Sequence, residues 1–93
     1  MPVELRLSKR FLKSLDPLGS ADRALVERAL QNLQREWGDP HTHSGLSIRR
    51  LHGAYFECRA GLDLRIVFRA SSDGLDIVLT GSHDNVRKLL RNE

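Results

Sequence analysis

The chain contains a single cysteine, Cys58, and no long apolar segment. One thiol cannot form a disulfide within the chain, and its place in an apolar, strand-like run predicts that it is buried. No apolar run approaches the roughly 20 residues of a membrane-spanning helix. The N-terminal MPVELRLSKR also lacks the apolar core of a secretory signal peptide. These absences argue against a disulfide-stabilised secreted domain and against a membrane protein, and they favour the reducing cytoplasm.

Internal repeats, low-complexity tracts and interdomain linkers are also absent, so the 93 residues are expected to form one domain, 1–93. Hydrophobic residues make up 40% and charged residues 29%, the proportions of an ordinary globular protein. The formal net charge is +3, and the isoelectric point is about 9.6. A basic domain of this size suggests a polyanion or an acidic protein as partner, although a plain solvated surface explains the same charge.

The first 38 residues predict a strand followed by two helices. Apolar and charged residues alternate over residues 2–8, which is typical of a half-buried strand. Ser8 is placed to cap a short helix that Pro17 ends. Ser20 begins a longer amphipathic helix with apolar residues at helical spacing, and Gly38 is its natural stop.

After a polar connection the hydrophobic period changes to two, which predicts three strands over residues 54–60, 62–70 and 75–81. Residues 48–51 are a further short extended candidate. Tight turns at Gly61 and at SSDG, where Gly74 is expected to adopt a positive φ, make these neighbours pair antiparallel. A short amphipathic helix follows, and its apolar side carries Val86, Leu89 and Leu90.

These elements predict an α+β fold in the order β-α-α-β-β-β-α. A small twisted antiparallel sheet carries two N-terminal helices packed on one face and a short C-terminal helix, and its other face stays open. Strand alternation predicts which side chains each face receives. The helix-covered face receives Phe56, Cys58, Leu64, Ile66, Phe68, Leu75, Ile77 and Leu79. The open face receives Tyr55, Glu57, Arg59, Arg65, Val67 and Arg69.

His83 follows the last strand on a Gly-Ser turn, at the rim of this open face. We therefore expect a carboxylate, several guanidinium groups and an imidazole to converge on one surface, unless a β-bulge shifts the alternation. No closed set of metal ligands accompanies them, because His41, His43 and His52 lack cysteine partners, and no glycine-rich phosphate loop is present. We expect no metal and no cofactor.

The order and spacing of several short motifs resemble the RelE/ParE superfamily of bacterial toxin–antitoxin toxins. The motifs are FLKSL at 11–15, ADRALVERALQNL at 21–33, HSGLSIRRLHGAYFECRAGLDLRIVFR at 43–69 and LDIVLTGSHDNVRKLL at 75–90. They are similar to the family's F.K.L segment, its L.G...E.R...YRI.F core and its terminal G.HD.VR segment. Together they cover nearly the whole chain, and the resemblance implies the same small sheet with two N-terminal helices.

On the RelE and YafQ side, the resemblance implies a ribosome-dependent endoribonuclease that cleaves messenger RNA in the ribosomal A site. A cognate antitoxin would wrap and mask the toxin in a hetero-oligomer, and mRNA and ribosomal RNA would be the other partners. The ParE side implies inhibition of DNA gyrase without RNA cleavage. Related domains also occur as non-catalytic binding modules.

Metal-independent RNA cleavage needs a base near the 2′-hydroxyl, cations for the charge on the phosphorane and an acid for the leaving oxygen. His83 suits either proton transfer because histidine titrates near neutral pH, and GSHD resembles the GTH motif of YafQ-like toxins. The alternatives are that His83 caps the final helix or contacts the antitoxin. Arg65 matches the arginine of YRI.F, whose planar fork suits phosphate, and an ion pair with Glu57 is its structural alternative.

Other residues are candidates for the same site. Glu57 resembles a general base of YoeB-like toxins, although an ion pair that orients Arg59 or Arg65 is the favoured explanation. Phosphate or RNA contacts are expected from Arg59, Arg65, Arg69, Arg87 and Lys88, and further candidates are His43, His52 and Tyr55. The chain departs from the family in its tail, because DNVRKLLRNE has no aromatic residue to stack on a base, and Tyr55 is its only tyrosine.

Overall fold

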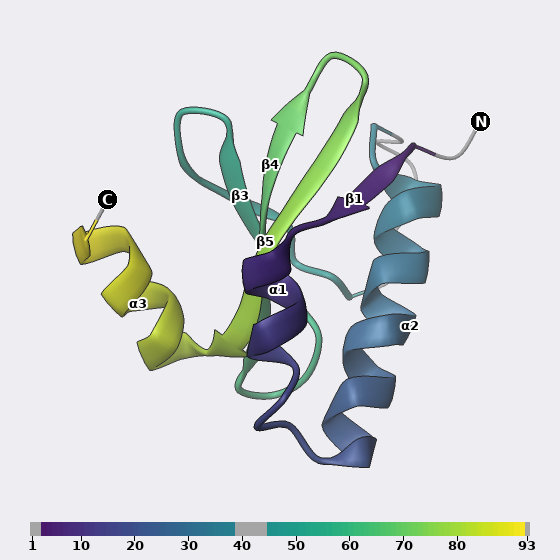
Figure 1. Ribbon diagram of the computed structural model, residues 1–93. Coiled ribbons are helices and arrows are strands. Elements are labelled where there is room, and N and C mark those ends of the chain that lie inside the picture. Colours follow the sequence, from purple (N-terminus) through teal and green to yellow (C-terminus); the bar gives the residue numbers. More distant parts are fainter. Residues whose placement is uncertain (1–2, 39–44, 93) are drawn as a thin grey trace.

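A computed structural model describes residues 3–38 and 45–92, apart from the side chains of residues 89, 90 and 92 (Figure 1). Among the described residues, no helix is long and apolar enough to cross a membrane. The elements are β1 Leu5–Leu7, α1 Lys9–Ser14, α2 Ser20–Glu36, β2 Arg49–His52, β3 Tyr55–Arg59, β4 Leu64–Ser71, β5 Gly74–Ser82 and α3 His83–Asn92.

Local sequence explains where the first helices begin and end. The Ser8 side chain accepts a hydrogen bond from the Phe11 amide and caps α1, as predicted. The next helix, α2, begins at Ser20 and ends beside Gly38, whose φ of 85° lies in the left-handed region that stops a helix. The short extended candidate also exists, as the edge strand β2.

The five strands form one sheet in the order β1-β5-β4-β3-β2. Strands β2 to β5 are an antiparallel meander, whereas β1 runs parallel to β5 and pairs Leu5 with Leu75. The α+β class is confirmed, but the sheet is mixed and not wholly antiparallel. The helices α1 and α2 separate β1 from the meander in sequence, so β1 has no hairpin partner and joins the last strand instead.

The main core lies between the sheet and the two N-terminal helices. Phe11 of α1 and Leu33 of α2 are buried against the β4 and β5 residues Ile66 and Ile77. In Figure 1, α1 lies in front of β5 and α2 runs beside it. Trp37 completes this core with edge-on ring contacts to Phe56 at 5.1 Å and Phe68 at 5.4 Å. The predicted helix-covered face is therefore correct for these strands, with one exception.

That exception is Leu79, and a β-bulge causes it. Val67 pairs with Leu79 but Phe68 pairs with Ile77, so Val78 is an extra residue on β5. The extra residue turns Leu79 to the opposite face, where it packs with Val67 and Val86. The prediction that Leu79 faces α1 and α2 was wrong for this reason.

The same contacts show that the second face of the sheet is not fully open. Val86 of α3 is 2% exposed and packs on Val67 and Leu79, so α3 covers the middle of this face. Figure 1 shows α3 on the other side of the sheet from α2. We call this surface of the sheet, which carries Glu57, Arg65 and Val67, the α3 face.

The β4–β5 turn also differs from its prediction. Gly74 has no positive φ. Glycine is needed at position 74 because the backbone of Glu4 passes very close to it. A Cβ at Gly74 would lie 2.8 Å from the backbone oxygen of Glu4. Only glycine lets the start of β1 come this near to the hairpin.

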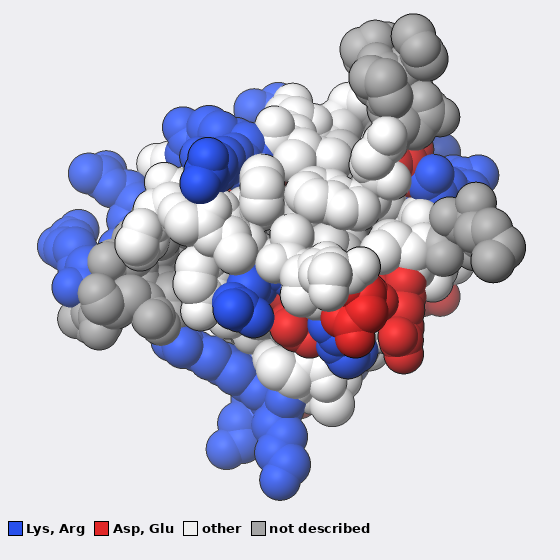
Figure 2. Space-filling model, turned by 90° about the horizontal axis from the view of Figure 1, so that it is seen from above, with Lys and Arg blue, Asp and Glu red and all other residues white. Residues whose placement is uncertain are grey.

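An ion-pair network around Arg6 fastens β1 to this hairpin. Arg6 Nε donates to Asp76 Oδ1 at 2.6 Å, and Arg6 Nη2 donates to Ser71 Oγ at 2.9 Å. Asp73 Oδ1 lies 3.4 Å from Arg6 Nη1, and Glu4 Oε2 lies 3.7 Å from it. Figure 2, a view onto this end of the molecule, shows most of the visible acidic atoms gathered in one patch, whereas basic side chains are spread around the rest of the outline. The acidic side chains of Glu4, Asp73 and Asp76 thus form, with Arg6, a clamp that joins β1 to the β4–β5 hairpin.

Candidate functional site

Four of the predicted residues meet at one hollow on the α3 face. Glu57, Arg59, Arg65 and His83 line a space of about 180 Å³ together with Ser47, Arg49 and Cys58. We call this space the basic hollow. Its residues come from β2 and the segment before it, from the second half of β3, from the start of β4 and from the start of α3. The convergence predicted from strand alternation is therefore present in the structure.

Strand pairing explains why the hollow forms here. Arg59 and Arg65 are directly opposite each other on β3 and β4, and Arg65 is opposite Gly81 on β5. Glycine leaves the neighbouring position on this face without a side chain. His83 stands two residues beyond Gly81, so the β5–α3 junction places its imidazole at the border of the hollow.

Glu57 is held by an arginine that the sequence analysis did not single out. Arg49 and Glu57 are paired across β2 and β3, and Arg49 Nη2 lies 2.7 Å from Glu57 Oε1. The Glu57 side chain is 8% exposed, whereas that of Arg49 is 65% exposed. The expected ion pair of Glu57 with Arg59 or Arg65 was wrong in its partner. The two adjacent arginines of RRLH indicated that one of them could pair with Glu57. The β2 strand is only four residues long, so its register could not be predicted from the sequence.

Arg59 and Arg65 have no ion-pair partner within the part of the chain that the structure describes. The Nε–H of Arg65 is buried and donates no hydrogen bond to any of the described residues. The backbone of Arg65 is fixed, because Thr80 Oγ1 donates to its carbonyl oxygen at 2.8 Å. Two like charges placed directly opposite in a sheet destabilise it. An anion bound between them would remove this repulsion and supply the missing acceptor.

His83 is the first residue of α3, and β5 reaches it without the intervening turn that the sequence suggested. Its backbone N–H points to Asp63 Oδ1 at 3.4 Å, and Ser82 Oγ accepts from the Asn85 amide at 3.2 Å. Ser82 and Asp63 therefore serve the first turn of α3, where a carboxylate is favourable. The imidazole of His83 is not needed as the cap, and the residue is exposed.

The remaining predicted residues lie outside the basic hollow. Arg69 is opposite Tyr55 at the far end of the strands, with Nη1 4.0 Å from Asp76 Oδ2. Arg87 and Lys88 are exposed on α3. His52 and Tyr55 lie close together at the β2–β3 hairpin. His43, like His41, falls outside the described residues. Residues 3–38 and 45–92 contain no group of three or more histidine, cysteine or acidic residues arranged to hold a metal.

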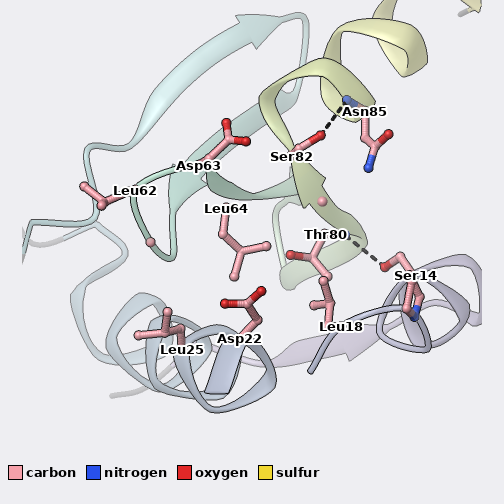
Figure 3. A pocket seen from close by; sticks show the side chains of 13 residues that line it. Ser14, Leu18, Asp22, Leu25, Leu62, Asp63, Leu64, Thr80, Ser82 and Asn85 are labelled. Atoms are coloured by element: carbon pink, nitrogen blue, oxygen red, sulfur yellow. Dashed lines mark hydrogen bonds between the residues drawn. The ribbon is translucent and has the colours of Figure 1, made fainter. Parts of the chain in front are cut away.

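A larger hollow of about 520 Å³ lies on the other side of the β5–α3 junction (Figure 3). Asp22 and Asp63 project toward it, and its floor includes Leu18, Leu25 and Leu64. No lysine or arginine lines it. Carboxylates without cations repel a phosphodiester. The basic hollow is therefore the better candidate for RNA chemistry although it is smaller.

No protein-family model and no curated protein sequence matches the chain. Solved structures do match its fold. Escherichia coli YafQ is 15% identical, with 90% of this chain and 97% of YafQ covered and a TM-score of 0.71. The RelB–RelE antitoxin–toxin complex from Methanococcus jannaschii gives 14% identity, 90% and 96% coverage and 0.70. The RelBE2 toxin–antitoxin complex from Mycobacterium tuberculosis gives 20% identity, 89% and 100% coverage and 0.68. The chain has the RelE/YafQ-like toxin fold.

Proposed function

We propose that this protein is the toxin of a type II toxin–antitoxin system. It is an endoribonuclease that cleaves messenger RNA in the ribosomal A site, and a cognate antitoxin restrains it. The observation that carries the proposal is the basic hollow, where an exposed imidazole meets two guanidinium groups that have no ion pair within the described part of the chain. The fold supports it, because the solved structures with this fold include toxins bound to antitoxins.

The reaction that these groups suit needs no metal. The 2′-oxygen of the substrate attacks the adjacent phosphorus and loses its proton, and the bond from phosphorus to the 5′-oxygen of the next nucleotide breaks. The products are a 2′,3′-cyclic phosphate and a 5′-hydroxyl. Negative charge on the phosphorane is greatest in the transition state, and there the guanidinium groups of Arg59 and Arg65 stabilise it most.

His83 carries one of the two proton transfers, because among residues 3–38 and 45–92 it is the only histidine that lines the basic hollow. The ion pair with Arg49 already occupies Oε1 of Glu57. We assign Glu57 chiefly to positioning Arg49 as a third cation, with its second carboxylate oxygen as the other candidate base. The exposed Arg87 and Lys88 are placed to contact ribosomal RNA or an acidic antitoxin.

The test is translation in a reconstituted cell-free system with mapping of messenger RNA 5′ ends. The parent is expected to cleave ribosome-bound messenger RNA. His83→Ala should reduce the cleavage rate by about 10²- to 10⁴-fold, the usual contribution of a general acid or base. Arg65→Ala should also reduce it strongly. Lys13→Ala, a matched loss of an exposed charge on α1, should leave it unchanged.

Cleavage by a folded double variant lacking both His83 and Arg65 would contradict the assigned site. Absence of cleavage by the parent would contradict the nuclease. In that case DNA breaks with intact translation would indicate a gyrase inhibitor, and harmless expression would indicate a binding module.

A further inference from the structure

We infer that His52 and Tyr55 form a platform on which one base of the bound RNA stacks. This inference rests on the proposed function, since it concerns the RNA that the basic hollow would cleave. Single-stranded RNA is held largely by aromatic rings that stack on its bases. The question is which rings of this chain are available.

Tyr55 is the one phenylalanine, tyrosine or tryptophan on the α3 face. The chain has three phenylalanines, one tryptophan and one tyrosine. The other four rings belong to the core under the helices, which contains Phe11, Trp37, Phe56 and Phe68. Tyr55 instead packs against the cluster of Val67, Leu79 and Val86. Any stacking of a base on this face by such a ring must therefore use Tyr55.

His52 extends the surface of Tyr55. The two rings have centroids 6.4 Å apart and planes inclined by only 23°. His52 is exposed, while Tyr55 is half-buried and held from below by its cluster. The pair thus combines a fixed ring with a solvent-facing ring in nearly the same orientation.

Hydrogen bonds hold the turn that carries the pair. Gly53 has a φ of 58°, a conformation that favours glycine. Arg50 Nε donates to the Gly53 carbonyl oxygen at 2.9 Å, and the Ala70 amide donates to the Ala54 carbonyl at 2.9 Å. A platform fixed before binding loses less conformational entropy when a base stacks on it.

Its position fits a nucleotide next to the cleaved bond. Tyr55 and Glu57 are two residues apart on β3 and face the same side, so their Cα atoms are separated by roughly 7 Å. Glu57 lines the basic hollow. Arg69 lies directly opposite Tyr55, and its side chain is 50% exposed. A strand with one phosphate in the hollow can place a neighbouring base on the rings and a neighbouring phosphate near Arg69.

The probe is an oligoribonucleotide with 2′-O-methyl groups, which prevent cleavage, and a single 2-aminopurine moved along its length. It is tested both free and in the A site of ribosomes. Stacking on an aromatic ring quenches 2-aminopurine fluorescence. The parent should quench it at one or two adjacent positions. His52→Ala and Tyr55→Leu should abolish the quenching and weaken binding by about 5- to 100-fold.

Two comparisons separate stacking from a structural effect. His52→Phe and Tyr55→Phe keep the rings and should retain both quenching and affinity. The ring-deleting variants should keep the parent's dependence of affinity on salt, whereas Arg69→Gln should make that dependence shallower by removing a phosphate contact. Leu12→Ala, which shortens an exposed apolar side chain on α1, controls for surface changes elsewhere.

Normal quenching by folded His52→Ala and Tyr55→Leu proteins would overturn the platform, as would no quenching by the parent in either setting. If the parent cleaves RNA and both ring variants cleave it with the same KM and kcat, the platform is overturned but the nuclease is supported. Quenching that depends on both rings, without any cleavage of unmodified RNA, would support the platform and overturn the nuclease.

Discussion

Arg49 and Glu57 face each other across β2 and β3, with 2.7 Å between Nη2 of the arginine and Oε1 of the carboxylate. This pair ties the edge strand to the sheet and gives the buried Glu57 carboxylate a cationic partner. Glu57 is thereby paired with Arg49 and not with Arg59 or Arg65. This choice of partner leaves Arg59 and Arg65 without an ion pair among the residues that the structure describes.

Replacement of Arg49 should destabilise the fold. Arg49→Gln leaves the nearly buried Glu57 carboxylate without its partner, and we expect the free energy of unfolding to fall by about 1–2 kcal/mol, limited by the exposure of Arg49. Urea titration measures this. Adding Glu57→Gln should recover part of the loss, because it removes the stranded charge. A double variant as unstable as the sum of the single losses would contradict the coupling.

Acid should weaken the clamp that joins β1 to the hairpin. The hydrogen bond from Arg6 holds the pKa of Asp76 below its ordinary 3.8, and the hydrogen bond from Ser71 does the same to the pKa of Asp73. A carboxyl with a lowered pKa in the folded state stabilises the fold above its unfolded pKa, and this stability is lost as pH falls through the folded value.

Urea midpoints measured from neutral pH down to strong acid test this relation. The parent should lose stability below about pH 4. Asp76→Asn should start from a lower midpoint at neutral pH and lose less on acidification. If the urea midpoints of the two proteins fall equally with decreasing pH, Asp76 is excluded as a source of the pH dependence.

The Cys58 thiol should be inert in the folded protein. Cys58 is fully buried, and burial, aided by the charge of Glu57, raises its pKa to about 12. Only the thiolate reacts readily with disulfide reagents. We expect almost no reaction with Ellman's reagent near pH 8 and rapid reaction in denaturing urea. Fast labelling of the folded protein would mean that β3 opens easily.

Val86 should couple stability to activity. Its side chain packs α3 against Val67 and Leu79, and His83 begins the same helix. Val86→Ala should lower the free energy of unfolding by about 1–3 kcal/mol through the cavity left behind. RNA cleavage should fall as well, because the imidazole loses its fixed position. Leu12→Ala, at a half-exposed site, should change both quantities little.

Much of the architecture follows from local pattern. The period-two runs predicted β3, β4 and β5, and their alternation placed Ile66, Phe68 and Ile77 under the helices. The same alternation brought Glu57, Arg59 and Arg65 to one face with His83 at its rim. These predictions depend only on how consecutive side chains leave a strand.

The errors arose where geometry depends on contacts distant in sequence. One extra residue, Val78, is apolar like its neighbours, so the run LDIVLTG gives no sign of the bulge that turns Leu79 over. Likewise, alternation in residues 2–8 reports a strand but not its direction. The pairing of Arg49 with Glu57 follows from the register of a four-residue strand, which no local pattern determines.

The parallel pairing of β1 with β5 also orders events during synthesis. Arg6 and its partner Asp76 are separated by 70 positions, so β1 leaves the ribosome long before its partner strand exists. The loop that must close between them makes this the slowest kind of contact to form. His83 lies beyond β5 and depends on the same completed strand. The basic hollow is therefore assembled only after β5 and His83 have been synthesised, and a nascent chain that has not reached them lacks the imidazole.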